Sequence, residues 1–221
     1  MLARLPHLAP ALLLSTCLAA ACDSGSDGGD GGDTDGHDDA ETEVITTVTL
    51  AFTPDDGGPV VTAAFSDPDG DGGESGTSDP VTLTAGTSYA LSITFANDFD
   101  DPPEDITVEI EAEAEEHQIF VYGTAVAGPA TAATTGPLVQ AYADAESDYG
   151  TNAVGDDLPV GLRHTIMASE AGTGELSVML RHLPELNGQP QKTAGLAESY
   201  ASGGTLPGEP DANVTFQVTV Q

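Results

Sequence analysis

The stretch that decides the fold is Val44-Ile45-Thr46-Thr47-Val48-Thr49-Leu50-Ala51-Phe52. It is rich in β-branched residues, and the alternate positions Val44, Thr46, Val48, Leu50 and Phe52 lie on one face of a strand. The turn cluster Pro54-Asp55-Asp56-Gly57-Gly58-Pro59 follows, and residues 60–65 form a second apolar run. Turn residues between two such runs predict a β-hairpin.

Similar short apolar runs continue to the end of the sequence, and Pro, Gly, Asp or Asn clusters separate most of them. They cover residues 81–84, 89–95, 118–122, 138–143, 160–167, 175–183 and 214–220. Many short strands with turn signals between them are typical of sandwiches. We therefore predict an all-β domain over 44–221, a single antiparallel β-sandwich of Ig-like or related type.

One segment after Pro102-Pro103 has a different pattern. Ile106, Val108 and Ile110 alternate as in a strand, whereas Ile106, Ile110, Ala114 and His117 share one helical stripe. Ala and Glu form helices well and strands poorly, and Asp105 is a good N-cap. The sequence predicts one short helix near 104–116.

The N-terminus reads as an export signal. Residues 1–21 carry Arg4, no acid and a Leu/Ala-rich run that ends in the small residues before Cys22. Two interpretations follow: a lipoprotein signal whose Cys22 receives a lipid, or an ordinary signal peptide cut near Ala21. We expect the former, because lipidation leaves no unpaired thiol in the mature chain.

Residues 22–43 are rich in Asp and Gly and lack large apolar side chains after Cys22. Such a segment cannot build a core, so we expect a disordered acidic tether. Its role is either a spacer, which we favour, or a loose cation sponge.

The charge balance excludes several partners. The chain has 37 acidic and 4 basic residues, a formal charge of −33, and no Trp. Nucleic acids and anionic membrane surfaces are held by Lys and Arg, so neither is expected. The acid excess reflects either a saline habitat or cation capture.

The pattern Asp67-x-Asp69-x-Asp71-Gly72 matches the first half of a calcium loop, with the Gly73 carbonyl as a fourth ligand. The bidentate Glu expected at position twelve is replaced by Ser78. The alternatives are a calcium site in a β-loop or a solvated acidic turn. Asp144, Glu146 and Asp148 repeat the alternation as a weaker second site.

Arg163-His164 and Arg181-His182 form another pair of motifs. A hairpin centred near Gly172 would place Arg163 opposite Arg181. The four side chains either form an anion or partner-binding patch or make ordinary surface ion pairs.

Common catalytic motifs are absent from the sequence, so we do not expect an enzyme. His117 beside Glu115 and Glu116 reads as a helix-end residue. We expect a non-catalytic binding or structural module, possible partners being a surface protein, a glycan or a small ligand. A periplasmic ligand-binding lipoprotein and, less favoured, a hydrolase are the alternatives.

Several short motifs, in order over most of 44–221, resemble a group of small bacterial cell-envelope lipoproteins of unknown function. They include Ile45-Thr46-Thr47-Val48, residues 65–73, Glu104-Asp105-Ile106-Thr107, Glu115-Glu116-His117-Gln118, residues 172–176, Leu180-Arg181-His182 and residues 211–220. Members are sometimes named "type 1 periplasmic binding fold superfamily", a two-lobed α/β fold for which this chain lacks the length and the helices. The resemblance implies a lipid-anchored location in the envelope, on a periplasmic or surface-exposed face, and no mechanism.

Overall fold

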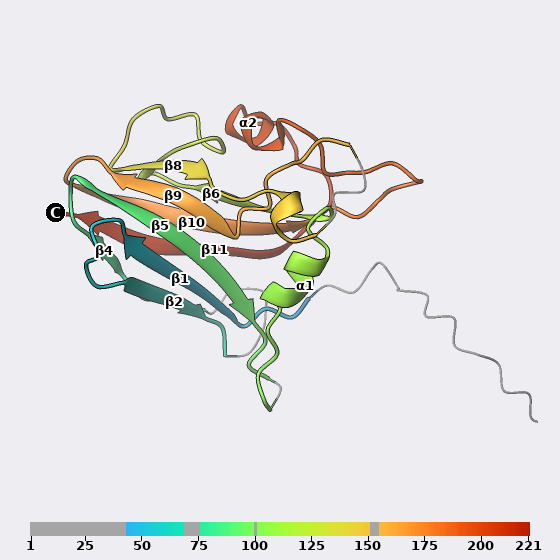
Figure 1. Cartoon of the computed structure of the whole chain (residues 1–221), viewed down its shortest axis with the longest axis horizontal. Coiled ribbons are helices and arrows are strands. Elements are labelled where there is room, and N and C mark those ends of the chain that lie inside the picture. Colours follow the sequence, from blue (N-terminus) through green and yellow to red (C-terminus); the bar gives the residue numbers. More distant parts are fainter. Residues whose placement is uncertain (1–42, 69–75, 100, 151–154) are drawn as a thin grey trace, which may run out of the picture. The chain divides into compact units, whose positions relative to one another are not determined.

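The computed structural model describes residues 43–68, 76–99, 101–150 and 155–221 (Figure 1). All of these belong to one compact unit, Asp38–Gln221. The expected signal peptide, Cys22 and nearly all of the expected tether lie outside the described residues. Within the described part of the chain, neither helix has the length and apolar character needed to cross a membrane.

The described residues are mostly β, as predicted. The strands are β1 (Thr47–Pro54), β2 (Val61–Ser66), β3 (Thr77–Ser78), β4 (Val81–Leu83), β5 (Thr87–Ala96), β6 (His117–Tyr122), β7 (Val126–Ala127), β8 (Leu138–Tyr142), β9 (Arg163–Ala168), β10 (Gly172–His182) and β11 (Glu209–Val220). The helices are α1 (Thr107–Ala112), α2 (Leu196–Ala201) and the single 3-10 turn η1 (Glu146–Asp148).

The strands form two sheets. The seven-stranded sheet has the order β3-β2-β1-β5-β9-β8-β7, and the four-stranded sheet has the order β4-β11-β10-β6. Most neighbours are antiparallel, but β4 pairs with β11 and β7 with β8 in parallel. The predicted purely antiparallel arrangement is therefore wrong at these two pairs. A parallel pair needs a connection that crosses back, and residues 128–137 return the chain from β7 to β8.

The predicted hairpin of β1 and β2 is confirmed. The two strands pair antiparallel from Thr47 with Ser66 to Phe52 with Val61. The turn after Pro54 is closed by a hydrogen bond from the Gly57 N–H to the Pro54 carbonyl. Gly57 has a φ of 80°, a conformation that glycine adopts without steric penalty.

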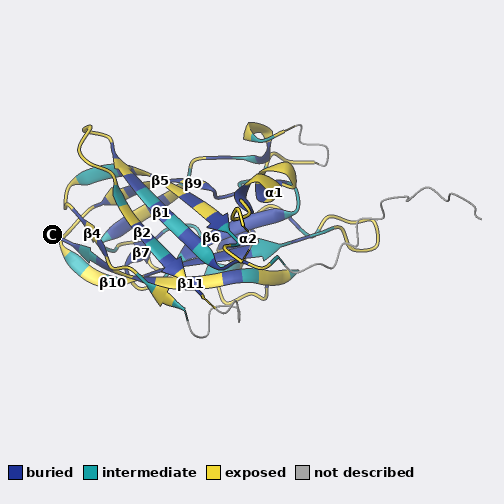
Figure 2. Ribbon diagram, turned by 90° about the horizontal axis from the view of Figure 1, so that it is seen from below, coloured by how far each residue is buried: buried dark blue, intermediate teal, exposed yellow. Residues whose placement is uncertain are grey.

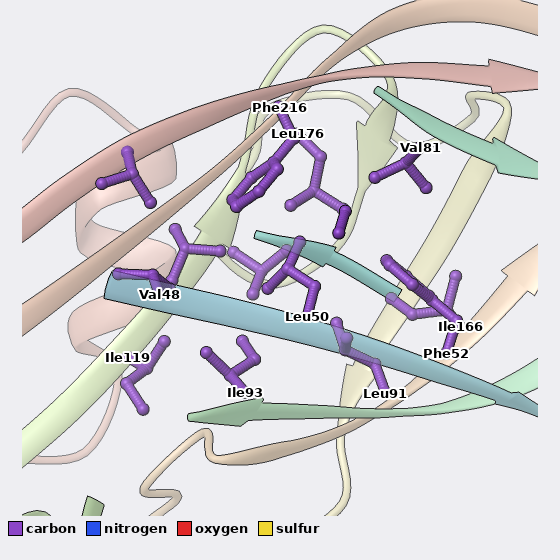
Figure 3. Close-up of a cluster of buried hydrophobic side chains, with 14 of the residues drawn as sticks. Val48, Leu50, Phe52, Val81, Leu91, Ile93, Ile119, Ile166, Leu176 and Phe216 are labelled. Carbon is purple, nitrogen blue, oxygen red and sulfur yellow. The ribbon is translucent and has the colours of Figure 1, made fainter. Parts of the chain in front are cut away.

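A single main core joins the two sheets. Val48, Leu50 and Phe52 of β1 are fully buried, and side chains from β10 and β11, among them Leu176 and Phe216, belong to the same cluster (Figure 3). Figure 2 shows buried and exposed residues alternating along the strands. Burying one such side chain stabilises the fold by about 1.5–3 kcal/mol, so this alternation holds the sheets together.

Helix α1 is shorter than predicted. It covers Thr107–Ala112, and residues 113–116 turn the chain so that β6 begins at His117. The four residues of the predicted helical stripe are buried, but Ala114 and His117 lie beyond the end of α1, so the stripe is helical only at Ile106 and Ile110. The Thr107 side chain exchanges hydrogen bonds with the backbone N–H and carbonyl of Phe95, which ties α1 to β5.

Candidate metal centre

The centre of the candidate site is His117, the first residue of β6, whose side chain is 1% exposed. Its Nδ1 lies 3.2 Å from the backbone carbonyl of Glu113. A carbonyl only accepts, so Nδ1 carries the proton and Nε2 presents a bare lone pair. Among the described residues this buried Nε2 has no hydrogen-bond partner.

Two carboxylates face this nitrogen. The Oε1 atom of Glu43, just ahead of β1, lies 3.8 Å from Nε2. One carboxylate oxygen each from Glu43 and Asp211 and one ring nitrogen of His117 all lie within 4.8 Å of one another. The Glu43 Oε2 and Asp211 Oδ2 atoms are also buried without a hydrogen-bond partner in the described part of the chain. Three buried polar atoms therefore converge here without a hydrogen bond among the described residues.

A β-bulge accounts for the position of Asp211. On β11, Ala212 pairs with Leu180 and Pro210 pairs with Arg181, so Asp211 is the extra residue that the ladder skips. Bulges redirect side chains and are frequent beside functional sites. The strand order β11-β10-β6 places this bulge and the start of β6 on either side of β10.

The electrostatics of the three groups favour the addition of positive charge. Burial raises the pKa of Glu43 to about 8, with further contributions from Asp211 and neighbouring glutamates. Burial also raises the pKa of Asp211 to about 6. Burial lowers the pKa of His117 to about 4, and the nearby His182 adds to this. The imidazole is therefore neutral at pH 7, as a metal ligand must be.

A second donor set shares His117 and reaches the surface. The rings of His117 and His182 stack with centroids 4.8 Å apart and planes 8° from parallel. His182 Nε2 lies 3.8 Å from Glu116 Oε2. Glu113, His117 and His182 also offer three ligand atoms within 4.8 Å of one another. Further donors thus lie beside the buried set.

The donor chemistry selects a class of ion. Calcium is held by oxygen atoms, whereas an imidazole nitrogen with carboxylates suits zinc and other divalent transition metals. Ligand atoms on a tetrahedral zinc ion are roughly 3.4 Å apart, as its bond lengths imply. The three ligand atoms lie within 4.8 Å of one another, so binding would require them to approach by up to about 1.4 Å.

Of the loop residues predicted to bind calcium, Asp67 is the only one among the described residues. Asp67 is fully buried, and its backbone N–H donates to the Thr46 carbonyl at 2.8 Å. Asp69, Asp71 and Gly73 lie outside the described residues. The calcium site at this loop stays a prediction.

The three acids of the weaker predicted site each have a separate partner. Asp144 accepts hydrogen bonds from the Tyr149 hydroxyl and from the backbone N–H groups of Gly161 and Arg163. Glu146 pairs with the buried Lys192 at 2.8 Å, and Asp148 accepts from the Ala145 N–H. These contacts tie η1 to the domain.

The hairpin expected around Gly172 is wrong, because β9 and β10 belong to different sheets. Arg163 pairs across strands with Ser92, and its side chain donates to Tyr149 and lies over that ring. The Arg181 side chain donates to three carbonyls at residues 206–208. The two arginines are thus placed by different neighbours, since the turn at 169–171 leads from one sheet to the other.

The two histidines of these motifs also separate. His164 is buried between Gln140 and Gly161, whereas His182 lies beside His117. The roles of Glu43 and Asp211 were missed by sequence reasoning. Residues 43, 117 and 211 have no common spacing, and only the fold brings them together. The one local signal was a histidine at the junction of an acidic segment and an apolar strand.

Comparison with known proteins gives no relative for this chain. No protein-family model matches it. No curated protein and no solved structure matches it. Function therefore has to be inferred from the residues themselves.

Proposed function

We propose that this chain is a non-catalytic, lipid-anchored protein of the bacterial envelope whose domain binds a divalent transition-metal ion. The ligands are Glu43, His117 and Asp211. The anchor is a lipid on Cys22, as the small residues before it indicate, and residues 22–43 form the tether. The two sheets around one core support a β-sandwich of Ig-like or related type.

The observation that carries the proposal is the bare Nε2 of the buried His117, which faces two carboxylates. Buried polar atoms are almost always hydrogen-bonded, so several buried polar atoms without partners at one point call for an explanation. A divalent cation satisfies all of them at once. The proposed transition-metal site is separate from the calcium site predicted for residues 67–73.

Calorimetric titration of the full chain, purified in detergent, with zinc chloride tests the proposal. We expect one zinc site that is lost in His117→Ala and weakened more than tenfold in Glu43→Gln and Asp211→Asn. His164→Gln is the matched control, because His164 is equally buried and lies outside the centre. Its zinc affinity should equal that of the wild type.

Calcium titration separates the two predicted sites. A calcium signal that disappears in Asp69→Asn/Asp71→Asn, with the zinc isotherm unchanged, would assign calcium to the loop. Zinc binding that survives His117→Ala at full affinity would refute the proposed metal centre.

A further inference from the structure

The metal centre lies where the chain enters the domain. The first backbone hydrogen bond of the described chain runs from the Thr46 N–H to the Ala96 carbonyl at 3.0 Å. Ahead of it, Ile45 is 8% exposed, and the Glu43 side chain is 15% exposed at the metal centre. Residues 43–45 thus lie outside both sheets and contact the domain through the side chains of Glu43 and Ile45.

The other two ligands belong to the sheet. His117 begins β6 and Asp211 forms the bulge of β11, and both strands pair with the long strand β10. His117 is paired in the β6–β10 ladder, and the residues on either side of Asp211 are paired in the β10–β11 ladder. Glu43 is the one of the three ligands that lies outside both sheets.

We propose that the ion acts as a clasp that fixes residues 43–45 onto the four-stranded sheet. This inference rests on the proposed function and adds a consequence of binding. In the absence of a cation, Glu43 Oε1 lies 3.8 Å from His117 Nε2, beyond hydrogen-bond distance, and no hydrogen bond among the described residues joins the Glu43 side chain to the sheet. An ion bound by Glu43, His117 and Asp211 joins all three. Metal supply then controls whether the chain just before β1 is held against the domain.

Hydrogen exchange of the full chain, with and without saturating zinc, measures this directly. We expect zinc to slow exchange at the amides of Val44 and Ile45 by tenfold or more, while amides inside β5 keep their rates. Glu43→Gln should abolish the protection at these two amides. Glu198→Gln, an exposed acid on α2, is the matched carboxylate control and should keep it.

Calorimetry on the same samples keeps the two proposals apart. Zinc that binds through His117 but leaves Val44 and Ile45 exchanging at their metal-free rates would overturn the clasp and leave the metal centre in place. Loss of the His117-dependent zinc signal would overturn both. Protection that persists in Glu43→Gln would also overturn the clasp, since another group would then hold the segment.

Discussion

His117 and His164 are buried alike but differ in what surrounds them. Each is 1% exposed, and burial lowers the pKa of each to about 4. His164 Nε2 donates to the Gly161 carbonyl, and its Nδ1 accepts from the Gln140 amide at 2.6 Å. His117 has one such partner, and its other nitrogen faces carboxylates. Burial and a shifted pKa are therefore common to both, and only the unpaired nitrogen marks a site.

The largest expected difference between them is in stability. His164→Ala should lower the free energy of unfolding by about 2–4 kcal/mol, because it leaves a cavity and two polar groups without partners. In metal-free buffer, His117→Ala should lower the free energy of unfolding by less than half as much. The substitution removes a buried ring nitrogen that has no hydrogen-bond partner among the described residues and faces the carboxyl groups of Glu43 and Asp211. Chemical denaturation of both variants measures the gap. Equal losses would show that His117 is as well satisfied as His164.

Metal should reverse this ranking. At 100 times its dissociation constant, an ion that binds only the folded state adds about 2.7 kcal/mol. We expect this gain in the wild type and in His164→Gln, and no gain in His117→Ala. Thermal unfolding with zinc at fixed ionic strength tests it. A gain of similar size in His117→Ala would place the stabilising ion elsewhere.

The pH dependence should isolate Glu43. A carboxyl whose pKa is higher in the folded state, here about 8 against an ordinary 4.5, loses stability as pH rises through that window. Asp211, whose pKa rises from 3.8 to about 6, likewise lowers the stability as pH rises between these values. His117, whose pKa falls from 6.5 to about 4, has the opposite effect and raises the stability as pH rises between them. Between about pH 6.5 and 8, Glu43 therefore dominates among these three groups.

In metal-free buffer the free energy of unfolding should fall over that range, by less than the metal gain. Glu43→Gln should flatten the curve, whereas Glu198→Gln should not. Zinc affinity should rise over the same range, because the ion displaces the Glu43 proton. Denaturation and calorimetry at pH 6.5, 7.2 and 8 measure both trends. A flat wild-type curve would show that Glu43 is ionised throughout.

The smallest effect is spectroscopic. The hydrogen bonds place the proton on Nδ1 of His117 and on Nε2 of His164, so the two rings are opposite neutral tautomers. Nitrogen NMR of the ring atoms should show this at pH 7. Added zinc should shift the His117 Nε2 resonance and leave both His164 resonances in place. A shift at His164 would end the contrast between the two residues.

Much of the fold follows from local patterns. The alternation from Val48 to Phe52 and the turn at Gly57 predict the β1–β2 hairpin, and most other strands fall at the predicted positions. Alternation identifies a strand and its buried face but not its neighbour, which explains the error over β9 and β10. Helix α2 was not predicted, although Leu196–Ala201 contains good helix formers and covers a second apolar cluster.

The candidate site was harder to predict than the fold. Its ligands come from a segment before β1, the start of β6 and a bulge in β11. A bulge depends on the pairing of two strands, so the sequence around Asp211 contains no local sign of it. The sequence pattern predicts His117 at a helix end, because the predicted helix is longer than α1, whereas His117 begins β6.

The position of β11 has a consequence for how the protein is made. This strand, Glu209–Val220, lies between β4 and β10, so the smaller sheet is in two pieces until it arrives. During synthesis, the hairpin of β1 and β2 can pair early, whereas β4 has to wait for a partner more than a hundred residues further along the chain. The bulge ligand Asp211 arrives with this last strand. Until residues 209–220 are present, neither the smaller sheet nor the proposed metal centre can be complete.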